Sequence, residues 1–178
     1  MQPQRIVGLV SQNANAYEEG LSDAWAPVRA YWADPSAANR QAIRDALLSV
    51  DAIGWQYLSG VPEPDLVAPE AILLDNMLLE RPGNKDIQLD LILDYANNLK
   101  QYPIFHTWLR NSHFPVLVIW GRNDPFFLPV GAHAFARDIP HAVVELLETG
   151  HFALETHCDL IAARVRAVLG QIPSERGK

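Results

Sequence analysis

The sequence is poor in cysteine, in basic residues and in long apolar runs. Cys158 is the single cysteine among 178 residues, so no disulfide can form within the chain and nothing requires an oxidising compartment. The 14 Lys and Arg residues against 21 Asp and Glu residues give a net charge of −7, which argues against nucleic acid and anionic membranes as partners. No apolar stretch approaches the length of a membrane span, about 18 residues. We therefore expect a cytoplasmic protein.

Two kinds of ligand-binding motif are also missing. No glycine-rich loop follows any apolar run in the way that a phosphate-binding loop would. His151 and His157 are six residues apart, which is not the spacing of two ligands on one helical face, and no set of carboxylates or cysteines completes a metal site. The sequence therefore predicts neither a cofactor nor a metal ion.

Three apolar runs have the composition of strands in a buried parallel sheet. Residues 6–10 (IVGLV) are continuously apolar, residues 114–121 (FPVLVIWG) begin with a proline near the start, and residues 142–150 (AVVELLETG) end at a glycine. Helix-like sequences follow the last two runs, at 130–140 and 156–170. Strand, helix, strand and helix in succession form a βαβ unit, whose crossover we expect to be right-handed.

The stretch between the first and second runs is helical in character. Prolines break it into short helices and turns around residues 62–82. From there on Ile87, Leu91, Tyr95 and Leu99 recur every four residues, which is a helical pattern. The sequence thus predicts an α/β fold with about three parallel strands and flanking helices. It also predicts a helical insertion between the first strand and the other two.

Two candidate catalytic residues follow the second and third predicted strands. Asp124 lies in WGRNDPFF and His151 lies in ETGHFALE, 27 residues apart, which is one βαβ repeat. Because ligands bind at the carboxyl ends of parallel strands and neighbouring strands bring their loops together, we expect a hydrogen bond between these side chains. An aspartate beside a histidine holds the imidazole tautomer and stabilises the imidazolium, as in a nucleophile–base–acid triad.

Each of the two residues also has a simpler explanation. An aspartate in an Asn-Asp-Pro sequence is most often a turn former or a helix cap, and a single histidine in a loop is usually just exposed. The joint occurrence, each residue at a strand end and the aspartate first, is much less common by chance. We therefore predict that Asp124 and His151 are an acid and a base.

Residues 115–169 (PVLVIWGRNDPFFLPVGAHAFARDIPHAVVELLETGHFALETHCDLIAARVRAVL) closely resemble the C-terminal end of α/β-hydrolase-fold enzymes. The nearest branch is the one that holds epoxide hydrolases and haloalkane dehalogenases. In that family the acid lies in a G-x-x-D segment after the seventh strand, which matches residues 121–124. The base lies in a G-H segment after the eighth strand, which matches Gly150 and His151.

The resemblance extends over nearly the whole chain but covers only the later part of the family's domain. It implies that residues 1–14 are strand six of the hydrolase core and that residues 15–112 are the helical cap and a connecting helix. Residues 113–178 then form the C-terminal core, with strands seven and eight and the last helix. The implied architecture is a partial α/β-hydrolase fold.

The nucleophile of this fold precedes the acid and the base, on a G-x-S-x-G or G-x-D-x-G elbow after strand five. No serine or aspartate here has that glycine pair; Ser59, for example, is flanked by Tyr57 and Val61. The oxyanion loop, usually after strand three, is missing as well. We therefore expect an ester, epoxide or carbon–halide hydrolase represented by its acid and base, inactive as an isolated chain. The alternative is a non-catalytic binding or assembly module, or the relic of a truncated hydrolase.

The resemblance also suggests contacts and partners. Asn13, at the active-site end of strand six, and Phe152, next to the base, are candidate substrate-binding residues. In a complete enzyme the partner is a small-molecule substrate. Strand six would otherwise pair with strand five, so residues 6–10 should present an open edge for the N-terminal half of the hydrolase or for a second copy of this chain.

Overall fold

The computed structural model describes residues 5–172, and a parallel sheet stands at their centre. Three strands, β1 (Leu9–Gln12), β2 (Val116–Gly121) and β3 (Val143–Leu147), lie in the order β1-β2-β3. Leu9 is opposite Val116, and Leu117 is opposite Val143. The predicted α/β class with three parallel strands and flanking helices is confirmed.

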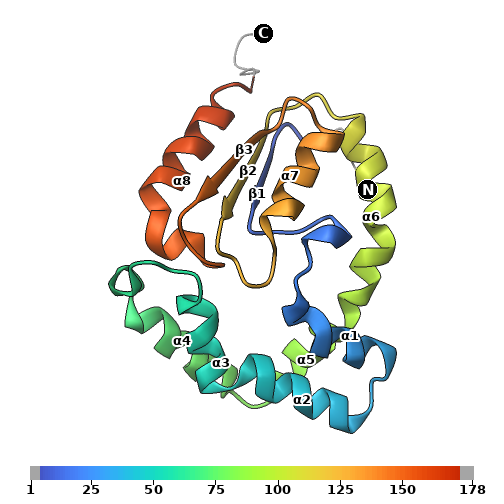
Figure 1. The fold of residues 1–178 in the computed structure, drawn as a ribbon, viewed down its shortest axis with the longest axis vertical. Helices are drawn as coiled ribbons and strands as arrows, with labels where there is room; N and C mark the ends of the chain where they lie inside the picture. Colours follow the sequence, from blue (N-terminus) through green and yellow to red (C-terminus); the bar gives the residue numbers. More distant parts are fainter. Residues whose placement is uncertain (1–4, 173–178) are drawn as a thin grey trace.

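The central strand β2 is buried along its whole length because helices cover both faces of the sheet. Val116, Val118 and Trp120 point to the face that packs against α6 (Ala96–Arg110) and α7 (Pro129–Asp138). Leu117 and Ile119 point to the other face, against α8 (Ala153–Leu169). Figure 1 shows α8 on one side of the sheet and α6 and α7 on the other. This two-sided burial explains why β2 is continuously apolar rather than alternating.

The first strand is displaced from the position that the sequence predicts. Instead of residues 6–10, β1 spans Leu9–Gln12, and Ile6 and Val7 are 43% and 58% exposed. The N–H of Leu9 donates to the carbonyl of Pro115, immediately before β2 begins, so residues 6–8 precede the start of the ladder. Within the described residues β1 pairs with β2 alone, which makes it an edge strand.

Five helices between β1 and α6 form a separate layer with its own core. They are α1 (Ala26–Ala33), α2 (Ala37–Leu48), α3 (Val50–Leu58), α4 (Pro69–Leu79) and α5 (Asn84–Asp94), and we call them the helical layer. Two short 3₁₀ turns also belong to the layer: η3 (Asp23–Trp25) leads into α1, and η4 (Pro64–Leu66) connects α3 to α4. A third, η2 (Glu18–Gly20), lies between β1 and η3. Ser36 and Ser49 begin α2 and α3 by accepting hydrogen bonds from backbone N–H groups of the first turn. The buried side chains of the layer form two clusters: Val28, Tyr31, Ile43, Leu48 and Leu89 in one, and Ile53, Tyr57 and Val67 in the other.

The helical layer lies at the carboxyl ends of the strands, where Figure 1 shows it below the sheet. Contacts between the two parts are formed by the loops that follow β2 and β3, for example through the stacking of Tyr57 on Phe152. The layer therefore closes one end of the sheet, the end at which parallel sheets bind ligands.

Among the described helices, none has both the length and the apolar character needed to span a bilayer.

The helical pattern from Ile87 to Leu99 is divided between two helices. The chain breaks at Tyr95 into α5 and α6, and Ile87 and Leu91 are 56% and 58% exposed. Leu89 is fully buried instead, beside Ile92 and Leu93. Because α5 carries apolar residues on more than one face, the four-residue spacing alone does not tell which face is buried.

Two glycines allow three backbone segments to meet at the strand ends. A Cβ added to Gly121, the last residue of β2, would overlap the carbonyl oxygen of Gly150 in the loop after β3. A Cβ added to Gly150 would overlap the carbonyl oxygen of Ser59, which follows α3. The sheet and the helical layer are therefore in direct backbone contact at this point, with no room for a side chain.

We expect Gly121→Ala to lower the free energy of unfolding by about 2–3 kcal/mol, because backbone atoms must shift to admit the methyl group. Gly54→Ala in α3 is the matched control, since no atom lies within 4 Å of its added Cβ. Alanine should raise helix stability there by roughly 0.5–1 kcal/mol. Urea unfolding followed by circular dichroism measures both variants; equal effects would contradict the close approach at Gly121.

Candidate active site

Asp124 and His151 meet at the carboxyl ends of β2 and β3. Nδ1 of His151 lies 2.8 Å from Oδ2 of Asp124, so the hydrogen bond expected from the sequence is confirmed. The Asp124 side chain is fully buried, whereas that of His151 is 21% exposed. The pair thus has a buried carboxylate and an imidazole that reaches the surface.

The carboxylate of Asp124 receives three further hydrogen bonds. The backbone N–H groups of Phe126 and Phe127 donate to Oδ1, at 2.8 and 3.0 Å. Nδ2 of Asn13 donates to Oδ2, at 2.7 Å. Since a carboxylate only accepts, Nδ1 of His151 carries the proton and the lone pair of the neutral ring is on Nε2. This is the tautomer that a general base needs when its acid partner holds Nδ1.

Aromatic rings fix the imidazole from several sides. The ring centroids of Phe126, Phe127 and Phe152 lie 5.3, 5.6 and 4.9 Å from that of His151. No hydrogen bond to Nε2 of His151 is formed by any group within residues 5–172. The orientation of the imidazole therefore comes from Asp124 and the rings, while Nε2 is left to act on something else.

Phe152 connects the Asp124–His151 pair to the helical layer. Its ring stacks on Tyr57 of α3 with centroids 4.3 Å apart. The Tyr57 hydroxyl donates to Oδ2 of Asp75 at 2.8 Å. Burial, followed by this hydrogen bond, raises the pKa of Tyr57 above its ordinary value. Phe152 is thus held by a fixed partner from the helical layer.

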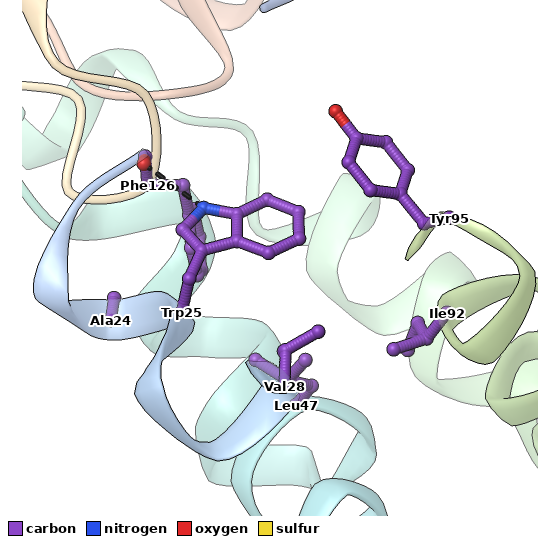
Figure 2. Close-up of a pocket in the computed structure, with 7 residues that line it drawn as sticks. All are labelled: Ala24, Trp25, Val28, Leu47, Ile92, Tyr95 and Phe126. Carbon is purple, nitrogen blue, oxygen red and sulfur yellow. Dashed lines mark hydrogen bonds between the residues drawn. The ribbon is translucent and has the colours of Figure 1, made fainter. Parts of the chain in front are cut away.

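A small apolar pocket lies beside the Asp124 loop. Its volume is about 70 Å³, and its walls come from the helical layer and from Phe126. Figure 2 shows Trp25 and Tyr95 as neighbours in its wall, and their ring centroids are 5.1 Å apart. The indole N–H of Trp25 donates to the carbonyl of Phe126 at 3.1 Å, drawn as the dashed line in Figure 2. The lining residues are Ala24, Trp25, Val28, Leu47, Ile92, Tyr95 and Phe126.

The structure brings the four predicted site residues together but gives Asn13 a different position from the expected one. Asn13 is only 5% exposed, and its amide faces Asp124 rather than an open surface. Phe152 is partly buried against His151. Sequence reasoning missed Phe126 and Phe127, whose backbone N–H groups hold the acid. The two residues that follow Asp-Pro are placed for this role by the turn itself, which is the signal that could have found them.

A parallel sheet whose adjacent strand ends carry a hydrogen-bonded aspartate and histidine, in that chain order, is the arrangement of the α/β-hydrolase fold. A family model described as the alpha/beta hydrolase fold matches residues 2–157. The chain belongs to the α/β-hydrolase fold family.

Individual relatives agree with this family. A Saccharomyces cerevisiae protein described as an uncharacterized hydrolase is 44% identical over 174 residues, covering 95% of this chain and 59% of that protein. A Pseudomonas putida 2-hydroxy-6-oxononadienedioate/2-hydroxy-6-oxononatrienedioate hydrolase is 37% identical over 87 residues, covering 48% of this chain and 29% of that protein.

Among solved structures, the 2-hydroxy-6-oxo-6-phenylhexa-2,4-dienoate hydrolase of Rhodococcus sp. strain RHA1 superposes with a TM-score of 0.66. It is 17% identical, and the match covers 95% of this chain and 57% of that one. This likeness concerns the fold alone. The chain spans less than two thirds of the length of each of these three relatives.

We expect Asp124→Asn to invert the tautomer of His151. If the side-chain oxygen of the new asparagine keeps the two backbone N–H bonds, its NH₂ group faces Nδ1, which must then accept rather than donate. The same NH₂ group faces Nδ2 of Asn13, so stability should fall by about 1–3 kcal/mol.

Nitrogen-15 NMR of the neutral imidazole and urea unfolding measure these two effects. Asp159→Asn, at an exposed position of α8, is the control and should change neither. An Nδ1–H tautomer that persists in Asp124→Asn with unchanged stability would contradict the hydrogen-bond arrangement described for Asp124.

Proposed function

We propose that this chain supplies the acid and the base of a hydrolase that cleaves ester, epoxide or carbon–halide bonds, with the nucleophile on a segment outside these 178 residues. The observation that carries the proposal is the hydrogen bond from Nδ1 of His151 to the buried carboxylate of Asp124, while no group in the described part of the chain binds Nε2. Membership of the α/β-hydrolase fold family supports it, because that fold uses a nucleophile, an acid and a base in this order.

The reaction proceeds in two steps. With a serine nucleophile, Nε2 of His151 first takes the hydroxyl proton while the serine oxygen bonds to the acyl carbon of an ester, and the imidazolium passes this proton to the alcohol that leaves. An aspartate nucleophile carries no proton: its oxygen bonds to the substrate carbon, and a halide departs with the bonding electrons or an epoxide C–O bond opens to an alkoxide that takes a proton from solvent. Both routes give a covalent ester. Nε2 of His151 then takes a proton from water while the water oxygen attacks that ester. Asp124 stabilises the imidazolium, which returns the proton to the departing oxygen. The product leaves and the nucleophile is restored.

The helical layer acts as the cap of this hydrolase. It lies at the carboxyl ends of the strands and contributes Tyr57 and Trp25 to the surroundings of His151. The pocket beside Phe126 receives an apolar end of the substrate, since its walls are aliphatic and aromatic. Phe152, at 4.9 Å from the imidazole centroid, contacts the substrate next to the base.

The character of this pocket separates two substrate classes. The Pseudomonas putida relative is named for a dioate, a substrate with two carboxylates. An apolar cavity of about 70 Å³ favours an uncharged group over a carboxylate, because burying an unpaired charge is costly. The pocket thus supports the proposal of an uncharged substrate, such as those of the branch that contains epoxide hydrolases and haloalkane dehalogenases.

The remaining part of the hydrolase fold covers two exposed surfaces of this chain. One is the open edge of β1, where Val10 is 38% exposed. The other is α4, whose Leu73, Leu74 and Met77 are at least half exposed although a helix this apolar is normally buried. If no such part exists, the same surfaces pair two copies of this chain, and the protein is a non-catalytic assembly module.

The chain alone should turn over none of three probes: 4-nitrophenyl acetate, styrene oxide and 1-chlorobutane. An acid and a base without a nucleophile and oxyanion donors retain little of the effect of the full set. Mixed with the portion of the Saccharomyces cerevisiae relative that this chain does not cover, it should hydrolyse at least one probe. His151→Ala should lower that rate about 10²- to 10⁴-fold.

The matched control is His133→Ala, because His133 is exposed on α7. It should leave the rate of the mixture unchanged. Turnover by the chain alone that disappears in His151→Ala would mean that the nucleophile lies within these residues. Binding of the two parts without any turnover would favour the assembly module.

We expect Val10→Lys to prevent self-association or binding of the complementary part, because a lysine on an edge strand opposes pairing with a further strand. Val143→Lys is the control: Val143 is 49% exposed and begins β3, at the opposite edge of the sheet. Light scattering over a range of concentrations measures the molar mass of each variant. An unaltered chain that remains a monomer with or without the complementary part would contradict the role of the β1 edge.

A further inference from the structure

Asn13 has an unusual backbone conformation at the end of β1. Its φ angle is +44°, the only positive value at a non-glycine residue between residues 5 and 172. Asparagine adopts this left-handed region more readily than most residues, though still at some cost in energy. The conformation persists because hydrogen bonds with neighbouring groups hold it in place.

Both polar atoms of the Asn13 side chain form hydrogen bonds. Its Oδ1 accepts hydrogen bonds from the backbone N–H of Gly121, at 3.1 Å, and from Nε2 of Gln12, at 2.7 Å. Its Nδ2 donates to Oδ2 of Asp124, at 2.7 Å. The left-handed turn is what directs this amide sideways, across the end of β2.

The amide oxygen and the NH₂ group of Asn13 cannot exchange positions. Because Gly121 offers an N–H, the amide oxygen must face β2, and the NH₂ group must then face the carboxylate. The oxygen of Asp124 that receives it is the one that also binds Nδ1 of His151. The two backbone N–H groups fix Oδ1, and Asn13 fixes Oδ2, so together they determine the rotation of the carboxylate.

We propose that Asn13 is a positioning residue for the Asp124–His151 pair: its amide holds Oδ2 of Asp124 where His151 needs it. The proposal rests on the proposed function for its consequence in turnover, but the contact itself can be measured without any substrate. The amide is neutral, so it orients the acid without cancelling the negative charge that stabilises the imidazolium. Asn13 lies after β1, so it gives this edge strand a part in the active site.

Two substitutions separate the amide donor from the turn that carries it. Asn13→Gly keeps the left-handed backbone at no steric cost and removes the whole side chain. Asn13→Asp, studied at pH 8, keeps the shape and an oxygen for the N–H of Gly121 but replaces the donor by an acceptor. The loss of the Nδ2 donor is the change that the two variants share.

The readout is the exchange of the His151 Nδ1 proton with solvent, followed by NMR. A charge-assisted hydrogen bond contributes about 1.5 kcal/mol or more, which corresponds to roughly tenfold faster exchange once it is lost. Both variants should show this acceleration while their circular dichroism spectra remain those of the folded chain. Ser11→Ala is the control, because Ser11 is buried in the same strand and its hydroxyl donates to the carbonyl of Ala14 rather than to Asp124.

In a complete hydrolase the same two variants should lower kcat about tenfold and leave KM unchanged, since Asn13 acts on the base and not on substrate. If either variant does not fold, the Asn13 amide protons of the unaltered chain provide the test. The one bonded to Asp124 should resonate downfield and exchange slowly, and it should lose both properties in Asp124→Asn.

The outcomes distinguish this proposal from the proposed function. A protected Nδ1 proton in the unaltered chain that stays protected in both variants would overturn the role of Asn13 alone. An unprotected Nδ1 proton in the unaltered chain would overturn the Asp124–His151 pair, and the role of Asn13 with it. A change in Asn13→Gly without one in Asn13→Asp would assign the effect to the contact with Gly121 instead.

Discussion

The buried carboxylate of Asp124 is the group on which the arrangement of the strand ends depends. It accepts hydrogen bonds from residues that follow each of the three strands: Asn13 after β1, Phe126 and Phe127 after β2, and His151 after β3. A buried carboxylate that lost these donors would be strongly destabilising, because its charge could not be compensated elsewhere. The three loops are therefore held by a common electrostatic requirement, and the same bonds maintain the fold and the geometry of the candidate site.

The helical layer is attached to this arrangement mainly through aromatic side chains and direct backbone contact. Tyr57 stacks on Phe152, and Trp25 is hydrogen-bonded to the carbonyl of Phe126. Gly150 lies against Ser59 with no side chain between them. Contacts between the helical layer and the sheet are thus concentrated at the residues that surround His151. A movement of the layer would therefore displace the residues that contact the imidazole.

The sequence was sufficient for features that depend on local pattern. The continuous apolar run of β2 predicted a strand buried on both faces, and the repeat from Asp124 to His151 predicted two neighbouring loops. Features that depend on contacts with a distant segment of the same chain were not predictable in this way. The start of β1 is set by where β2 begins, and α5 has more than one apolar face, from which only the packing of Leu89 selects. The direction of the Asn13 amide follows from its positive φ angle and from the N–H of Gly121, neither of which has a pattern in the sequence.

Phe126 serves the site with two chemically independent parts. Its backbone N–H binds the carboxylate of Asp124, and its ring forms one wall of the apolar pocket and touches the imidazole. Only the second contribution depends on the identity of the side chain. In the hydrolase proposed above, substrate preference can therefore diversify at this position during evolution while the hydrogen bond to Asp124 is inherited unchanged.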